Sequence, residues 1–196
     1  MANGWRLLAT VLGAAAVHEL GHLLALRLLG AHVTGLRVSV LGAVLETDSG
    51  CLSYGGELLA VLAGPAANLL CALLLTARDG ARWAVPVGTH LVLGLFNLLP
   101  VGPLDGGRAL YLLTVWAFGP APAERAARWI GTAAAASLAA GVGWLMWRTG
   151  GSLWLLPAAG GLLWAAVSGG GRAAVSGNVW IFLAISIGIL YNTVLY

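Results

Sequence analysis

Charged residues are scarce in this chain of 196 residues, where Asp, Glu, Lys and Arg make up 9% and hydrophobic residues 60%. A soluble domain carries about 25% charged residues, so this chain has too few to cover a water-exposed surface. Lysine is absent, and the arginines stand singly near the ends of apolar runs, without the basic stripe of a nucleic-acid-binding protein. The two cysteines, Cys51 and Cys71, are too few for a disulfide framework and lack metal-site spacing. The composition predicts an integral membrane protein in contact with the lipid bilayer, with no nucleic-acid partner.

Long apolar segments make up most of the sequence. About 20 residues are needed to cross a bilayer as a helix, and six segments reach or approach that length. The start of the first also resembles a signal peptide, with Ala14-Ala15-Ala16 as a cleavage site. Its apolar pattern continues to Leu29, which favours an uncleaved membrane helix. The six segments are residues 5–29, 57–77, 83–99, 129–147, 152–168 and 178–195.

The gaps between these segments are too short to hold a soluble domain. We therefore expect one integral membrane domain over residues 1–196, with a core at about 5–118 and C-terminal helices at about 129–195. The predicted fold class is an all-α polytopic membrane protein of about six transmembrane helices.

Two stretches interrupt the helical pattern. Residues 33–47 alternate in part between apolar and polar side chains and contain Gly35 and Gly42, which predicts a short β-hairpin-like segment after the first helix. Residues 97–107, NLLPVGPLDGG, hold two prolines and three glycines and predict a broken helix. Irregular backbone at membrane depth survives only when it is buried in protein or lines a wet cavity, so both stretches indicate a site.

The sequence H-E-L-G-H at residues 18–22 lies inside the first apolar segment. Residues i and i+4 share one face of a helix, so His18 and His22 can bind one Zn²⁺ together. Glu19 is then placed to take a proton from the attacking water. Three ionisable groups at bilayer depth are costly unless they have a partner or a function.

A peptidase zinc site needs three protein ligands and one open position, so a third ligand must come from elsewhere. Asp105 differs from the other candidates because it lies in the broken apolar segment, where a carboxylate is otherwise hard to explain. Capping the following helix is an equally good explanation of Asp105 from the residues alone. The other candidates are His32, Glu46, Asp48, Glu57, Asp79, His90 and Glu124. We interpret His90 as a packed or interfacial histidine and Glu57 as a helix-dipole partner.

Three ordered motifs resemble a known family. H-E-L-G-H at 18–22, G-P-A-A-N at 64–68 and N-L-L-P-V-G-P-L-D-G-G at 97–107 are similar to those of the site-2 proteases, which are intramembrane zinc metalloproteases. The resemblance covers about residues 8–118 and is greatest to the compact branch that contains the stage IV sporulation protease. The span expected at 178–195 has no clear counterpart in the family pattern.

The resemblance implies one zinc ion per chain, bound by His18, His22 and Asp105, with Glu19 as the catalytic base. It also implies that Asn68 and Asn97 hold the substrate or stabilise the oxyanion. The implied function is zinc-dependent hydrolysis of a peptide bond within or near a transmembrane segment of a membrane-embedded protein substrate. That substrate could be a membrane-tethered transcription factor precursor, as in regulated intramembrane proteolysis during sporulation. The implied location is the bacterial cell membrane, as a multi-pass protein with a membrane-protein regulator as a further partner.

Three alternatives stay open. A membrane transporter could use His18, Glu19, His22 and Asp105 as a proton relay, and it would purify without stoichiometric zinc. A prenyl-protein protease would need a downstream Glu motif, which this sequence lacks. An inactive homologue that only binds membrane proteins is disfavoured because all the family's motif residues are present.

Overall fold

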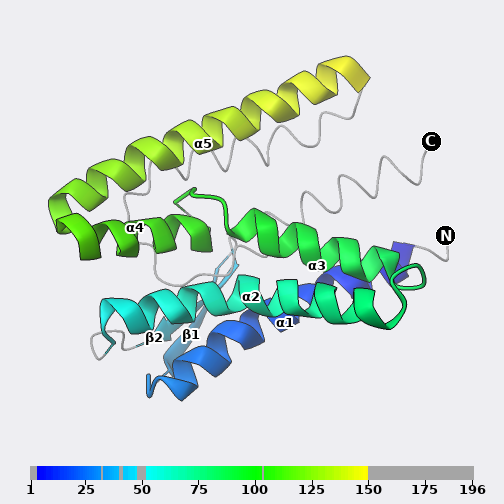
Figure 1. The fold of residues 1–196 in the computed structure, drawn as a ribbon, viewed down its shortest axis with the longest axis horizontal. Helices are drawn as coiled ribbons and strands as arrows, with labels where there is room; N and C mark the ends of the chain where they lie inside the picture. The colour runs from blue at the N-terminus through cyan, green and yellow to red at the C-terminus, as the bar shows by residue number, and fades with distance from the viewer. Residues whose placement is uncertain (1–3, 32, 40–41, 48–51, 103, 150–196) are drawn as a thin grey trace.

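The computed structural model describes residues 4–31, 33–39, 42–47, 52–102 and 104–149 (Figure 1). The predicted spans at 152–168 and 178–195 lie outside these residues, as do His32 and Asp48. The described elements are α1 (Gly4–Leu28), β1 (Val33–Ser39), β2 (Gly42–Thr47), α2 (Tyr54–Asp79), α3 (Ala84–Asn97), α4 (Asp105–Phe118) and α5 (Pro120–Thr149).

Helix α2 lies at the centre of the described fold. It packs against α1 and α3, which also contact each other, and its N-terminal part contacts α4, which in turn packs on α5 (Figure 1). The predicted all-α membrane fold with a hairpin and a broken helix is confirmed.

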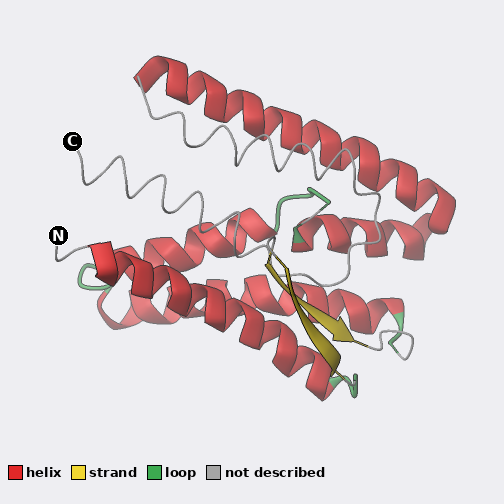
Figure 2. Ribbon diagram, turned by 180° about the vertical axis from the view of Figure 1, so that it is seen from behind, coloured by secondary structure: helices red, strands yellow, loops and turns green. Residues whose placement is uncertain are grey.

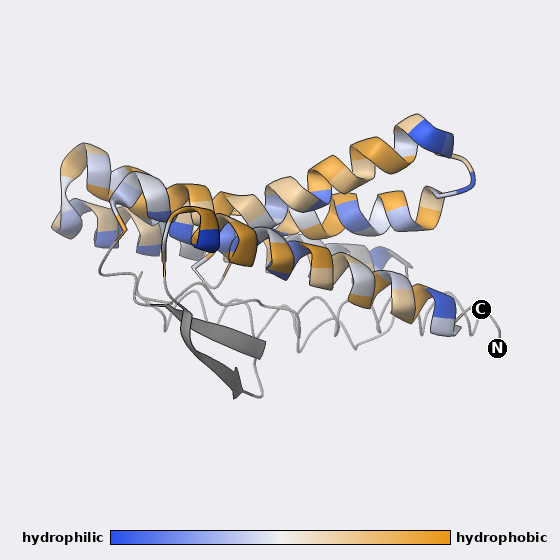
Figure 3. Ribbon diagram, turned by 90° about the horizontal axis from the view of Figure 1, so that it is seen from below, coloured by the Kyte–Doolittle hydropathy of each residue, from blue (hydrophilic) through white to orange (hydrophobic). Residues whose placement is uncertain are grey.

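Three of the described helices are long and apolar enough to cross a bilayer: Trp5–Leu28, Tyr54–Asp79 and Pro120–Arg148. Hydrophobic residues predominate along the described helices (Figure 3). Leu24 is 61% exposed, Leu73 65% and Trp129 75%. Such a surface suits lipid rather than water, and the chain is an integral membrane protein.

Two predicted spans differ from the observed helices. The segment at 83–99 forms α3, whose 14 residues extend about 21 Å, short of the roughly 30 Å hydrocarbon core. The segment at 129–147 begins earlier, at Pro120, as α5. Residues 120–128, which the prediction left outside the spans, belong to this helix. The first N–H groups of a helix have no partners inside it, so proline is tolerated there. The count of six spans stays a prediction.

The two strands form an antiparallel pair in which Arg37 lies opposite Val44 and Ser39 opposite Gly42 (Figure 2). The register is irregular between Val33 and Gly35. The prediction of a short hairpin after the first helix is therefore confirmed.

The predicted break in the helical pattern lies between α3 and α4. Helix α3 ends at Asn97 and α4 begins at Asp105. Short backbone hydrogen bonds hold the intervening turn, with Val101 N donating to Leu99 O at 2.7 Å and Leu104 N to Val101 O at 2.8 Å. Val101 and Leu104 are buried against α5 residues, including Ala135, which fixes the point where α4 starts.

Candidate metal centre

Helix α1 brings His18 and His22 onto one face, as their spacing predicts. Both are buried, at 4% and 1% exposure, and their Nε2 atoms lie 3.1 Å apart. Their rings meet edge to face with centroids 4.7 Å apart. The two nitrogens thus point at a common position on the protein-facing side of α1.

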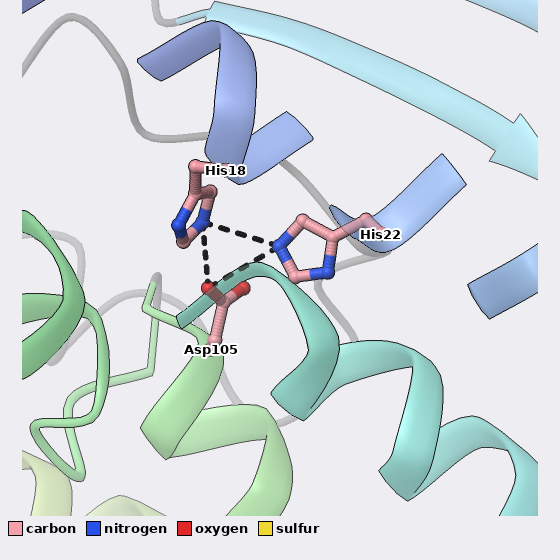
Figure 4. A group of neighbouring side chains, drawn as sticks. All are labelled: His18, His22 and Asp105. Carbon is pink, nitrogen blue, oxygen red and sulfur yellow. Dashed lines mark hydrogen bonds and ion pairs between the residues drawn. The ribbon is translucent and has the colours of Figure 1, made fainter. Parts of the chain in front are cut away.

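Asp105 completes this position from α4 (Figure 4). Its Oδ2 lies 3.0 Å from His18 Nε2 and 3.4 Å from His22 Nε2. Asp105 is the first residue of α4, and the cap position belongs to Leu104, which makes no side-chain cap. The structure therefore does not support the capping explanation, because the carboxylate faces the two histidines.

The spacing of these three atoms fits a zinc ion. Ligands about 2.0–2.1 Å from zinc at tetrahedral angles lie roughly 3.3 Å from one another, and the three observed separations are 3.0, 3.1 and 3.4 Å. Among the described residues, this is the group of His, Cys, Asp or Glu that converges closely enough to bind one ion.

Two buried carboxylate oxygens reinforce this fit. Within the described part of the chain, Asp105 Oδ2 and Glu19 Oε1 form no hydrogen bond of normal geometry. Glu19 Oε1 is thus a buried polar atom without a partner, which is costly and indicates a solvent or ligand contact. Asp105 Oδ2 faces the two histidine nitrogens without a hydrogen bond of normal geometry, as expected of three atoms arranged to bind one ion. A metal ion coordinated by Asp105 and a water molecule beside Glu19 would satisfy both.

Helix α2 fixes the orientation of His22 through the ring nitrogen that faces away from the other two ligands. Its Nδ1–H donates to the Ala60 carbonyl at 2.8 Å, which leaves the Nε2 lone pair free for a metal. Gly64, one helical turn further along α2, provides the space for the ring, because a Cβ there would lie 2.6 Å from His22 Cε1.

His18 is fixed by the side-chain amide of Asn68. Asn68 Nδ2 lies 3.1 Å from His18 Nδ1, and Asn68 Oδ1 lies 2.9 Å from His90 Nδ1 on α3. Asn68 is fully buried and His90 is 8% exposed. To contact a substrate, as predicted, the Asn68 amide would have to leave both histidines.

Other glycines of the motifs allow close backbone packing around the site. A Cβ on Gly21 would lie 2.6 Å from the Ala63 carbonyl oxygen, so this glycine lets α1 approach α2. A Cβ on Gly106 would lie 2.5 Å from the Leu99 oxygen, and one on Gly107 would lie 2.8 Å from Gly102 N. These contacts hold the start of α4, and with it Asp105, against the turn that precedes it.

Asn97 is the last residue of α3 and is buried at 7% exposure. Its Nδ2 donates to the Leu93 carbonyl at 3.1 Å within the same helix. The structure thus gives Asn97 a local bond at the end of α3, and a role toward substrate stays a prediction.

The remaining candidates lie apart from the three ligands. Glu57, in the first turn of α2, pairs with Arg108 of α4, whose Nε donates to Glu57 Oε1 at 2.9 Å. Asp79 is the last residue of α2, and Glu124 lies near the start of α5. The backbone of Glu46 lies in β2, opposite Gly35.

Comparison with known proteins points to one fold. No family model matches the chain. The site-2 protease from Methanocaldococcus jannaschii superposes with a TM-score of 0.63 and 22% sequence identity, over 87% of this chain and 80% of that one. The chain has the site-2 protease fold.

A sequence comparison agrees with this fold. Two Mycobacterium tuberculosis proteins, both named "Putative zinc metalloprotease Rip3", are 31% identical over 110 residues. The match covers 50% of this chain and only 28% of each relative. Both comparisons support the resemblance to the site-2 proteases that the motifs indicated, whereas the stage IV sporulation branch stays a prediction.

The sequence interpretation missed two features of this site-2 protease fold. It predicted a packed or interfacial His90 without its contact to Asn68, and it assigned Glu57 to the helix dipole without its partner Arg108. The available signal for His90 was its position seven residues before Asn97, which puts both on one face of α3. No signal pointed to Arg108, because it lies far from Glu57 in sequence.

Proposed function

We propose that this chain is an intramembrane zinc metalloendopeptidase that hydrolyses a peptide bond within or near a transmembrane segment of a membrane-embedded protein. The observation that carries this proposal is the convergence of two imidazole nitrogens and one carboxylate oxygen within 4.8 Å, deep among apolar helices. The likeness of the chain to proteins named as a site-2 protease and a zinc metalloprotease supports the proposal.

The donor set favours zinc. Two histidines and one carboxylate match the three-ligand pattern of catalytic zinc sites, which leave one position for water or substrate. Bound there, zinc would supply an activated water and polarise the scissile carbonyl. His18, His22 and Asp105 would hold it, each from the atom named above.

Glu19 is the proposed general base. It follows His18 on α1 and its Oε1 is buried without a partner in the described structure, so it can accept a proton from an attacking water. The same carboxyl group can then donate that proton to the leaving amine.

The proposed substrate enters the site in extended form, because a helix hides its peptide bonds. The β1–β2 pair offers a strand edge to which an extended peptide could add. Proline substitutions between Arg37 and Val44 would remove edge donors. They should impair cleavage, and unaffected cleavage would rule this docking mode out.

Asn97 is proposed to contact the substrate or the oxyanion, since it lies at the end of α3 where the chain becomes irregular. A membrane-tethered transcription factor precursor is the proposed natural substrate, and a membrane-protein regulator the further partner. Comparing the membrane proteomes of cells that express the wild-type or the Glu19→Gln chain would identify that substrate.

The test of the function uses purified full-length chain in detergent micelles with a fluorogenic transmembrane peptide. Cleavage should stop on addition of phenanthroline and return when zinc is restored. A proton relay in a transporter would purify without stoichiometric zinc, and an inactive homologue would bind zinc without cleaving any peptide. Cleavage that continues after complete removal of metal would contradict the proposal.

A further inference from the structure

We propose that Asn68 and His90 are positioning residues that fix the proton on His18 and aim its Nε2 at the metal, an inference that rests on the proposed zinc site. The observation behind it is a continuous buried chain from α3 to α1. His90 Nδ1 lies 2.9 Å from the Asn68 amide, and that amide lies 3.1 Å from His18 Nδ1.

The first step concerns the tautomer of His18. Its Nε2 faces Asp105 Oδ2 at 3.0 Å and His22 Nε2 at 3.1 Å, so Nε2 is the atom that binds a metal. A neutral imidazole that gives its Nε2 lone pair to a metal carries its proton on Nδ1. His18 Nδ1–H therefore needs an acceptor, and the Asn68 amide is the group beside it.

The second step fixes the orientation of the amide. As placed, Asn68 presents its Nδ2 to His18 Nδ1, which requires the His18 proton to be on Nε2. A half-turn exchanges the amide oxygen and nitrogen at nearly the same positions. Metal binding by His18 selects the turned orientation, in which Asn68 Oδ1 accepts from His18 Nδ1–H.

The third step assigns a role to His90. With the amide turned, Asn68 Nδ2 points at His90 Nδ1 and must donate to it, so His90 carries its proton on Nε2. By accepting this hydrogen bond, His90 Nδ1 stabilises the orientation of the Asn68 amide that is compatible with metal binding by His18. His90 thus acts on the metal through Asn68 and His18, without touching the metal itself.

Substitutions at His90 distinguish a positioning role from simple packing. Leucine resembles histidine in volume but cannot accept a hydrogen bond. Asparagine is smaller, yet its carbonyl oxygen can occupy a position close to that of Nδ1. Packing therefore predicts that His90→Leu is tolerated better than His90→Asn, whereas the positioning role predicts the opposite order.

The experiment measures zinc affinity of the full-length chain in micelles by competition with a chromophoric chelator. Partners of a metal-bound histidine typically contribute about 10- to 100-fold in affinity. We expect Asn68→Leu to lower zinc affinity by a factor in this range and His90→Leu to lower it about tenfold. The zinc affinity of His90→Asn should stay within about threefold of wild type. Thr89→Val is the matched control, because the exposed Thr89 hydroxyl donates within its own helix, to the Val85 carbonyl at 2.9 Å.

A second readout is the visible absorption of the cobalt-substituted chain, which reports the geometry around the metal. His90→Leu should change this spectrum, and His90→Asn should restore it. Wild-type affinity in His90→Leu, or a larger loss in His90→Asn than in His90→Leu, would overturn the positioning role. Asp105→Ala in the same series separates the two proposals: unchanged affinity there would overturn the zinc site itself, and the positioning role with it.

Discussion

Gly64 of α2 faces the imidazole of His22 on α1, and no side chain larger than hydrogen fits between them. A Cβ at residue 64 would lie 2.6 Å from His22 Cε1 and 2.7 Å from Cδ2. The ring cannot easily withdraw, because its Nδ1–H is bound to the Ala60 carbonyl of the same helix. This glycine therefore determines where His22 can present its Nε2.

Gly64→Ala should displace His22 and lower zinc affinity by about tenfold or more, as expected when the support of a metal-bound histidine is lost. Zinc content and helicity by circular dichroism provide the measurement. Gly13→Ala in α1 is the control, because a Cβ there meets no atom of the described residues within 4 Å. Equal zinc binding in both variants would show that His22 does not depend on this space.

The Glu57–Arg108 pair ties the start of α2 to α4, the helix that begins with Asp105. The two side chains are 14% and 21% exposed, and Arg108 also lies over the Tyr111 ring. Removing one partner leaves the other charge poorly solvated. Glu57→Gln or Arg108→Gln should each cost about 1–3 kcal/mol of stability, somewhat below the cost of breaking a fully buried pair.

Thermal unfolding in micelles checks this, with the double variant as the informative comparison. If the two charges interact, the double variant should lose less stability than the summed losses of the two single variants. Strict additivity would mean that the two charges act independently.

Asn97→Ala should lower kcat while zinc content stays unchanged, if the amide contacts the substrate or the oxyanion. Removing one such donor costs about 10²–10³ in kcat in other proteases. The Asn97 bond to the Leu93 carbonyl is the competing explanation. A loss of thermal stability with a normal kcat would assign Asn97 to the end of α3 alone.

Glu19→Gln should abolish cleavage and leave zinc bound, since the amide cannot accept the proton of the attacking water. Peptide cleavage and elemental analysis on the same sample test this. Loss of zinc from the variant would mean that Glu19 is a ligand rather than the base.

Local spacing and polarity in the sequence anticipated much of the site. His18 and His22 share a face because a helix repeats every 3.6 residues, and Asp105 was conspicuous as a carboxylate in an apolar, proline-rich stretch. Composition alone gave the membrane class. The structure adds what spacing cannot supply, namely that Asp105 Oδ2 faces both imidazoles from a different helix.

Features that depend on packing between helices were not predictable. His90 and Asn68 meet across α2 and α3, and nothing in either segment specifies that crossing. Helix α5 begins at Pro120, since proline suits a first helical turn, whereas the predicted span began only at residue 129. A helix after Asp105 was considered but was not among the predicted spans, and the observed α4 has 14 residues, or about 21 Å, which is too short to cross a bilayer.

His18, His22 and Asp105 together are expected to bind one zinc ion. Elemental analysis of purified wild-type chain and of the Asp105→Ala variant, after dialysis against a weak chelator, tests it most directly. We expect about one zinc per wild-type chain and a large loss of zinc from the variant, because one of three protein ligands is removed. Equal zinc in both samples, or none in the wild type, would contradict it.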